Sequence, residues 1–221
     1  TATQAGTSLR NAELFERVQT QQEQLEAVLN SISDALFVVD ERWNIQLANP
    51  ADVNGQTADS TTPNGQHLFV TLLLPRDATL QAINTTDTYV QDTLAHNEPM
   101  TVRLMTEALG APASVQMLHV LQGANVGASA TPITLVQSTD GLWEGGAANG
   151  YVVLFAKSVT QTLTTPLIYT APTDTTTHLI TGLTPEAGYD VQITASADGV
   201  QVNIQPGGQF QADAGGVLVI Q

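Results

Sequence analysis

Tyr189-Asp-Val-Gln-Ile-Thr-Ala-Ser-Ala-Asp-Gly-Val-Gln-Val-Asn-Ile204 is the stretch of sequence that decides the fold. In its first half apolar and polar residues alternate, which places Tyr189, Val191 and Ile193 on one face of a strand and the residues between them toward water. Asp198-Gly199 follows, a dipeptide that supplies the positive φ angles of a tight hairpin. The alternation then resumes. The stretch therefore predicts two antiparallel strands joined by a tight turn.

The same pattern recurs along most of the chain. Further short apolar or alternating runs lie at Trp43–Leu47, His67–Leu73, Met100–Met105, Ser114–Leu121, Ile133–Val136, Tyr151–Phe155, Leu167–Tyr169, His178–Ile180 and Val217–Ile220. Turn signals separate them at Asn54-Gly55, Asn64-Gly65, Asp140-Gly141, Asn149-Gly150 and Pro206-Gly207-Gly208. Because no helical period intervenes, residues 42–221 predict an antiparallel β-sandwich in a mainly β protein. Two sub-sandwiches, 42–160 and 161–221, are the finer expectation.

Residues 1–41 have a different character and predict one long N-terminal α-helix. From Thr7 to about Asp34 there is no Gly or Pro, and residues that favour helices dominate. Residues spaced alternately four and three apart form one stripe, which consists of Leu14, Val18, Gln21, Leu25, Val28 and Ile32. Two interpretations stay open. The helix packs on its own domain, or it forms a parallel dimeric coiled coil in which Gln21 fixes the register and makes the protein a homo-oligomer.

Composition excludes several classes of function. The 221 residues include six basic and 21 acidic side chains, a formal charge of −15, so we expect no nucleic-acid partner. No apolar run approaches the ~20 residues that span a bilayer. Without cysteine there is no disulfide scaffold, thiolate zinc site or cysteine nucleophile. The four histidines lie far apart and match no metal-binding motif, so neither a metal nor a cofactor is predicted.

The sequence contains no pattern typical of a catalytic centre. It has neither a Gly-x-Ser-x-Gly nucleophile elbow nor a phosphate loop that ends in Gly-Lys-Ser/Thr. After residue 42 the only basic residues are Arg76, Arg103 and Lys157, too few for a cleft that binds an acidic sugar. Trp143 lies in the turn-rich segment Ser138–Gly146 and has two interpretations. Its side chain folds over a sheet edge, or it is an exposed platform on which a sugar stacks.

One local motif resembles a known structural device. Leu183-Thr-Pro185-Glu-Ala-Gly-Tyr189 precedes an alternating strand and is similar to the tyrosine corner of fibronectin type III domains. There the tyrosine hydroxyl bonds to the backbone a few residues upstream. The resemblance implies a structural role for Leu183, Pro185 and Tyr189.

A broader resemblance covers most of residues 42–221. It is carried by the segments Trp43–Leu47, Gln66–Pro75, Met117–Gln122, Tyr151–Lys157, His178–Pro185 and Gly215–Ile220. These look like the β-rich C-terminal portion of heparinase II/III-type polysaccharide lyases. In that family an α-helical toroid precedes the β portion and supplies much of the active site, and this chain has no room for one. The resemblance therefore implies a fold and a polysaccharide partner, with no catalytic residue carried over.

The N-terminal segment has a resemblance of its own. Ser8–Arg17 and Leu25–Glu41, and more weakly Asn44–Ala51, look like the linker by which bacterial sensor histidine kinases leave a GAF domain and enter a PAS domain. The resemblance implies a signalling helix. Nothing after Ala51 continues the PAS pattern, so no haem or flavin site is carried over.

These observations favour a non-catalytic β-sandwich module with a structural, adhesive or assembly role. We expect it to self-associate through its N-terminal helix, its sheet edges or both, in an extracellular or cell-envelope setting. Two alternatives stay open. The chain is a signalling fragment of a sensor kinase, which would be cytoplasmic, or it is an accessory carbohydrate-contacting domain of a polysaccharide lyase.

Overall fold

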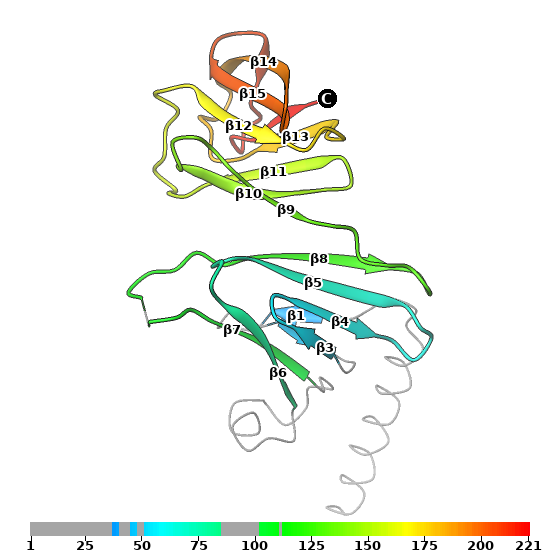
Figure 1. Cartoon of the computed structure of the whole chain (residues 1–221). Coiled ribbons are helices and arrows are strands. Elements are labelled where there is room, and N and C mark those ends of the chain that lie inside the picture. The colour runs from blue at the N-terminus through cyan, green and yellow to red at the C-terminus, as the bar shows by residue number, and fades with distance from the viewer. Residues whose placement is uncertain (1–36, 40–44, 48–50, 85–101, 111) are drawn as a thin grey trace, which may run out of the picture. The chain divides into compact units, whose positions relative to one another are not determined.

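The structure is a computed structural model, and it describes residues 37–39, 45–47, 51–84, 102–110 and 112–221 (Figure 1). Every regular element within these ranges is a β-strand, which confirms the prediction of a mainly β fold. The predicted helix and its stripe, Leu14, Val18, Gln21, Leu25, Val28 and Ile32, lie outside the described residues. No described helix is long and apolar enough to span a membrane.

The chain divides into two compact units, and the division corrects the predicted boundary. The first unit comprises residues 1–116 with 121–130, and the second comprises 117–120 with 131–221. The sequence pattern predicts the break at 160/161. It falls thirty residues earlier because the hairpin over 143–156 pairs with a later strand, residues 177–180, and so belongs to the C-terminal sheet.

In its described part the first unit consists of two four-stranded sheets. One has the order β1-β2-β7-β6, with bounds Phe37–Val39, Ile45–Leu47, Val102–Glu107 and Thr79–Asn84. The other has the order β3-β4-β5-β8, with bounds Ala51–Asn54, Thr57–Thr61, His67–Leu74 and Leu118–Ala124, although residues 118–120 of β8 are counted with the second unit. The alternating strand β5 turns Leu68, Val70 and Leu72 inward. They share a core with buried residues of the other sheet, Ile45, Leu47, Leu80, Val102 and Leu104.

The second unit is also built from two sheets. The larger has the order β17-β13-β11-β10-β9, with bounds Leu218–Ile220, Thr177–Ile180, Tyr151–Ala156, Trp143–Ala148 and Thr134–Gln137. The smaller has the order β12-β15-β14-β16, with bounds Leu167–Ala171, Gly199–Pro206, Gly188–Ser196 and Phe210–Gln211. Their inner faces share one core, which includes Trp143, Leu154, Tyr169, Ile180, Ile204 and Leu218. The pair β11–β13 is parallel, a departure from the expected antiparallel pattern.

The stretch that decided the fold forms the predicted hairpin, β14 paired with β15. Gly199 takes a positive φ at the turn, where an added Cβ would collide with the carbonyl oxygen of Ala171. Tyr189 is buried as the alternation predicted, but Ile193 is about half exposed. The reason is that β14 is longer than the core it covers, since from Gln192 to its end the whole strand is exposed.

Candidate functional site

A groove lies over β3, β4 and β5, where most of its lining residues are on the face opposite the core and Val53, Ala58 and Val70 of the core-facing row complete it. Its volume is about 310 Å³, and it is lined by Asp52, Val53, Asn54, Thr57, Ala58, Asp59, Phe69, Val70, Thr71 and Ala130. The strand register aligns its side chains in rows. Asp52 stands opposite Asp59, which stands opposite Phe69, and the neighbouring row is Asn54, Thr57 and Thr71. Polar side chains of three strands thus surround one aromatic ring.

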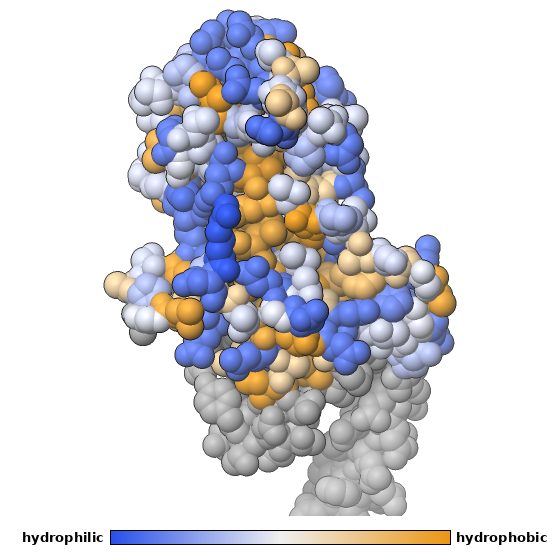
Figure 2. Space-filling view, in the orientation of Figure 1, coloured by the Kyte–Doolittle hydropathy of each residue, from blue (hydrophilic) through white to orange (hydrophobic). Residues whose placement is uncertain are grey.

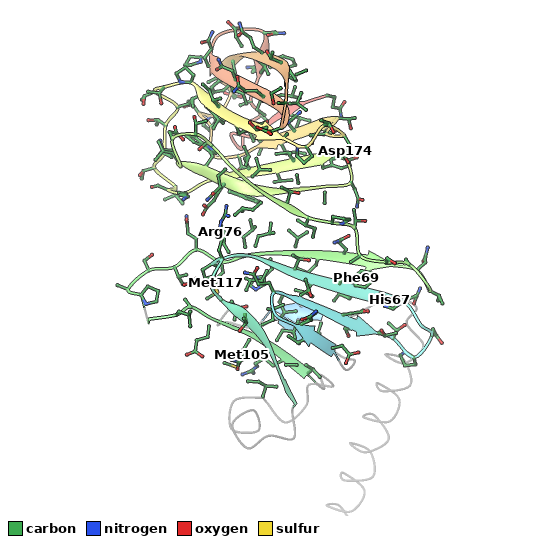
Figure 3. The ribbon with its side chains drawn as sticks, viewed as in Figure 1. His67, Phe69, Arg76, Met105, Met117 and Asp174 are labelled. Carbon is green, nitrogen blue, oxygen red and sulfur yellow. The ribbon has the colours of Figure 1, made fainter. Side chains whose placement is uncertain are left out.

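His67 fixes the geometry at one end of this groove. Its Nδ1 lies 3.0 and 3.1 Å from the two carboxylate oxygens of Asp59. Its ring stacks on Phe69, with the centroids 5.1 Å apart and an interplanar angle of 8°. Figure 3 shows the two labelled side chains near one another on β5. These contacts hold the Asp59 carboxylate in place and leave Phe69 only 9% exposed.

The groove offers hydrogen-bond acceptors beside apolar surface. Asp52 and Asp59 carry like charges at directly opposed positions of an antiparallel pair, an arrangement that costs stability. No hydrogen bond or ion pair to the Asp52 carboxylate is found among the described residues. Within the same ranges, no three His, Asp or Glu side chains come together as a metal site. A ligand that contacted the ionised Asp52 carboxylate would therefore have to donate a hydrogen bond to it.

A second surface of interest is the outer face of the five-stranded sheet in the second unit. One row crosses all five strands in register, and it consists of Leu135, Gly146, Val153, Leu179 and Val219. Tyr151 and Phe155 lie on the same face, one on each side of Val153, and are about half exposed. We call this set the apolar row with its flanking aromatics. Figure 2 shows apolar surface over β9, β10 and β11.

An ion pair borders this row. Lys157 Nζ lies 2.9 Å from Oε2 of Glu144, and Gln137 Nε2 donates to the same oxygen at 3.0 Å. The register aligns Gln137, Glu144 and Phe155 as the neighbouring row of the sheet. The apolar row therefore has a polar border on that side, as the centre of a contact surface commonly does.

Of the two interpretations of Trp143, the structure contradicts the exposed platform on which a sugar stacks. Trp143 is the first residue of β10, only 1% exposed, and its indole N–H donates to the carbonyl oxygen of Thr181 at 3.0 Å. The ring belongs to the core between the sheets, so neither face is open to a ligand. The turn-rich composition of Ser138–Gly146 concealed this, because its glycines lie within the strand as well as in the turn.

The residues of the tyrosine-corner motif come together in space. The backbone N–H of Thr184 donates to the Tyr189 hydroxyl oxygen at 3.1 Å, which is the type of contact that defines such a corner. Leu183 and Tyr189 are buried in the core of the second unit, and Pro185 is exposed. Glu186, between them, has a φ of 60°, and its N–H donates to the carbonyl oxygen of Asp213.

The groove residues were not singled out from the sequence, which treats His67 as a strand residue beside apolar neighbours. A signal was present. The turn signal after Asn54 predicts a hairpin centred there. Residues equally far from the centre of a hairpin face each other, which pairs Asp52 with Asp59. His67 and Phe69 share a face at spacing two. No motif connects the two segments, so only the pairing of β4 with β5 brings them together.

Comparisons with known proteins add no family to these observations. No protein-family model matches the chain, and no curated protein matches it.

Proposed function

We propose that this chain is a non-catalytic β-sandwich module that associates with copies of itself through the outer face of the β17-β13-β11-β10-β9 sheet. The observation that carries the proposal is the apolar row with its flanking aromatics. A sheet that faces water usually alternates apolar inward and polar outward residues. Here five adjacent strands all turn an apolar residue or glycine outward in the same row.

The shape of the row suits a second copy. Gly146 has no side chain, so no side chain of the row projects between Leu135 and Val153, its partners on either side, and we call this position the hollow. An apolar side chain from another copy, such as Leu179, can pack into that hollow. Two such faces related by a two-fold axis would each provide both the projection and the hollow, which is how an isologous interface closes. Face-to-face packing of sheets buries side chains in this way.

The size of the face sets the strength of the contact. Five strands spaced about 4.8 Å apart and three to six residues long make a face of roughly 24 by 15 Å, or about 360 Å² per copy. Stable complexes usually bury about 800 Å² per partner. We therefore expect a weak dimer that forms at high protein concentration. The formal charge of −15 opposes association, so added salt should strengthen it.

Sedimentation velocity of the full chain over a range of protein and salt concentrations tests the proposal. Val219→Lys places a charge in the apolar row and should shift the protein to the monomer. Val159→Lys is the matched control, because Val159 is fully exposed in a loop of the same unit. Thermal unfolding of both variants checks that they fold.

The predicted coiled coil is tested in the same measurement. Leu25→Lys changes only the N-terminal stripe, so a loss of dimer with Leu25→Lys and none with Val219→Lys would assign association to the helix and overturn the sheet contact. A wild-type chain that stays monomeric at every protein and salt concentration would overturn self-association altogether.

A further inference from the structure

We propose that the groove on the outer face of β3, β4 and β5 binds a neutral carbohydrate. The inference goes beyond self-association, because it concerns other residues in the other unit of the chain. It starts from the side chains that the register assembles there. Three neighbouring strands bring two carboxylates, one amide and two threonine hydroxyls to the rim of one concavity.

The groove has two kinds of surface. Most of its surface is apolar and includes Ala130 and the small exposed part of Phe69, and Asp52, Asn54 and Asp59 are among its polar lining residues. A sugar ring has matching properties, since its C–H face is apolar and its hydroxyls project from its edge as donors. A wholly apolar ligand that covered the Asp52 carboxylate would leave it without a hydrogen-bond partner, which carries a desolvation cost.

The two carboxylates favour a ligand rich in hydrogen-bond donors. Asp52 and Asp59 oppose each other across the β3–β4 pair, and adjacent hydroxyls of a sugar can donate to both. His67 already holds Asp59, so that carboxylate needs no reorganisation on binding. A uronate or sulfated sugar would bring a negative charge to this site and be repelled, which confines the ligand to neutral sugars.

The size of the groove limits how much of a glycan it holds. Its volume of about 310 Å³ lies at the lower end of the range of about 300–1,000 Å³ typical of small-molecule pockets. That volume limits the site to a small part of a glycan. The site is therefore expected to bind an internal or terminal unit of an oligosaccharide with modest affinity.

A glycan array probed with the full chain tests the proposal, followed by calorimetric titration of the neutral oligosaccharide that binds best. The array carries neutral oligosaccharides, uronate-containing oligosaccharides and an arginine-rich peptide. Asp52→Ala removes a rim carboxylate that is exposed and makes no hydrogen bond to a described side chain. Asp77→Ala is the matched control, because Asp77 is an exposed aspartate of the same unit that does not line the groove.

We expect binding of neutral oligosaccharides that Asp52→Ala weakens about tenfold or more, the loss typical of a hydrogen bond to a charged group, and that Asp77→Ala leaves unchanged. Silence of all neutral glycans would overturn the proposal. So would binding of uronates or the peptide in their place, because the partner would then belong to another class. Equal binding by the two variants would place any sugar site elsewhere. Self-association can fail in its own test without affecting any of these outcomes.

Discussion

The Tyr169 hydroxyl lies 2.9 Å from Nδ1 of His178, a contact that joins the two sheets of the second unit inside their shared core. Both side chains are buried. Burial raises the pKa of Tyr169 and lowers the pKa of His178, so both groups are neutral near pH 7. A neutral imidazole with its proton on Nε2 accepts the hydroxyl hydrogen at Nδ1.

Tyr169→Phe should destabilise the second unit. The substitution keeps the ring and removes only the hydroxyl, which leaves Nδ1 of His178 buried without its partner. The cost of an unsatisfied buried polar group is about 1–3 kcal/mol of unfolding free energy. Urea denaturation followed by tryptophan fluorescence, to which the buried Trp143 of the second unit contributes, measures it. Tyr151→Phe is the control, because Tyr151 is about half exposed, and a loss as large there would contradict a specific role for the buried contact.

The lowered pKa of His178 predicts that stability falls as the solution is acidified. The unfolded chain binds a proton at His178 near pH 6.5, whereas the folded chain binds it only at lower pH. Between these values the unfolded state carries more protons, so unfolding free energy rises with pH and declines as pH falls below about 6.5. A difference of one bound proton between the unfolded and folded states changes the unfolding free energy by at most about 1.4 kcal/mol per pH unit.

Unfolding free energies of the wild type and of His178→Gln at several values between pH 7 and pH 5 test this. Burial also lowers the pKa of His119, which acts in the same direction in both proteins, so the difference between the two curves isolates His178. The wild type should lose more stability than the variant over this range. Parallel curves would show that His178 does not bind its proton differently in the two states.

Gly145→Ala should destabilise the β10–β11 hairpin. A Cβ at Gly145 would collide with the backbone carbonyl oxygen of Val153, which cannot rotate away as a side chain could. The strands must separate locally, at a cost of about 1–3 kcal/mol or more. Gly208→Ala is the control, because nothing lies within 4 Å of its Cβ position, and it should stay within about 0.5 kcal/mol of the wild type. Equal melting temperatures of the two variants would contradict the prediction.

Strands with a clear apolar pattern could be predicted from the sequence, and the others could not. The run His67–Leu73 became β5 almost unchanged, because six of its seven residues are apolar or β-branched. Thr57-Ala-Asp-Ser-Thr61 forms β4 although only Ala58 among them is apolar and buried. This segment is a strand because it pairs with β3 and β5. That pairing cannot be predicted from the propensities of its own residues. The same holds for Trp143-Glu-Gly-Gly-Ala-Ala148, where glycines suggested a loop.

The candidate sites depend on such pairings even more. The apolar row takes one residue from each of five strands, spread from Leu135 to Val219. Each residue looks ordinary in its own segment, and only the sheet order and the parallel β11–β13 register align them. The tyrosine corner is different, because Leu183, Pro185 and Tyr189 lie within seven residues of each other and the contact is local. Short-range devices can thus be recognised from sequence, and surfaces built across strands cannot.

The Glu144–Lys157 pair gives a prediction at the border of the apolar row. The Glu144 side chain is only 8% exposed, whereas that of Lys157 is 34% exposed. Removing the lysine therefore leaves a buried carboxylate without the cation that balances its charge. Lys157→Met should therefore lower the unfolding free energy by about 1–3 kcal/mol. This is less than the loss expected when a fully buried ion pair is broken, because water reaches the lysine. Lys157→Arg keeps the charge and should lose less.

A double-mutant cycle separates the loss of this ion pair from the loss of lysine packing. Glu144→Gln removes the carboxylate charge and can keep its amide partner Gln137. In the Glu144→Gln background, Lys157→Met should lower the unfolding free energy by less than it does in the wild type, because no buried charge then remains to be balanced. A coupling of about 0.5 kcal/mol or more is expected for contacting groups. If the two losses simply add, Lys157 stabilises the sheet through its aliphatic stem, and the electrostatic account of this border is wrong.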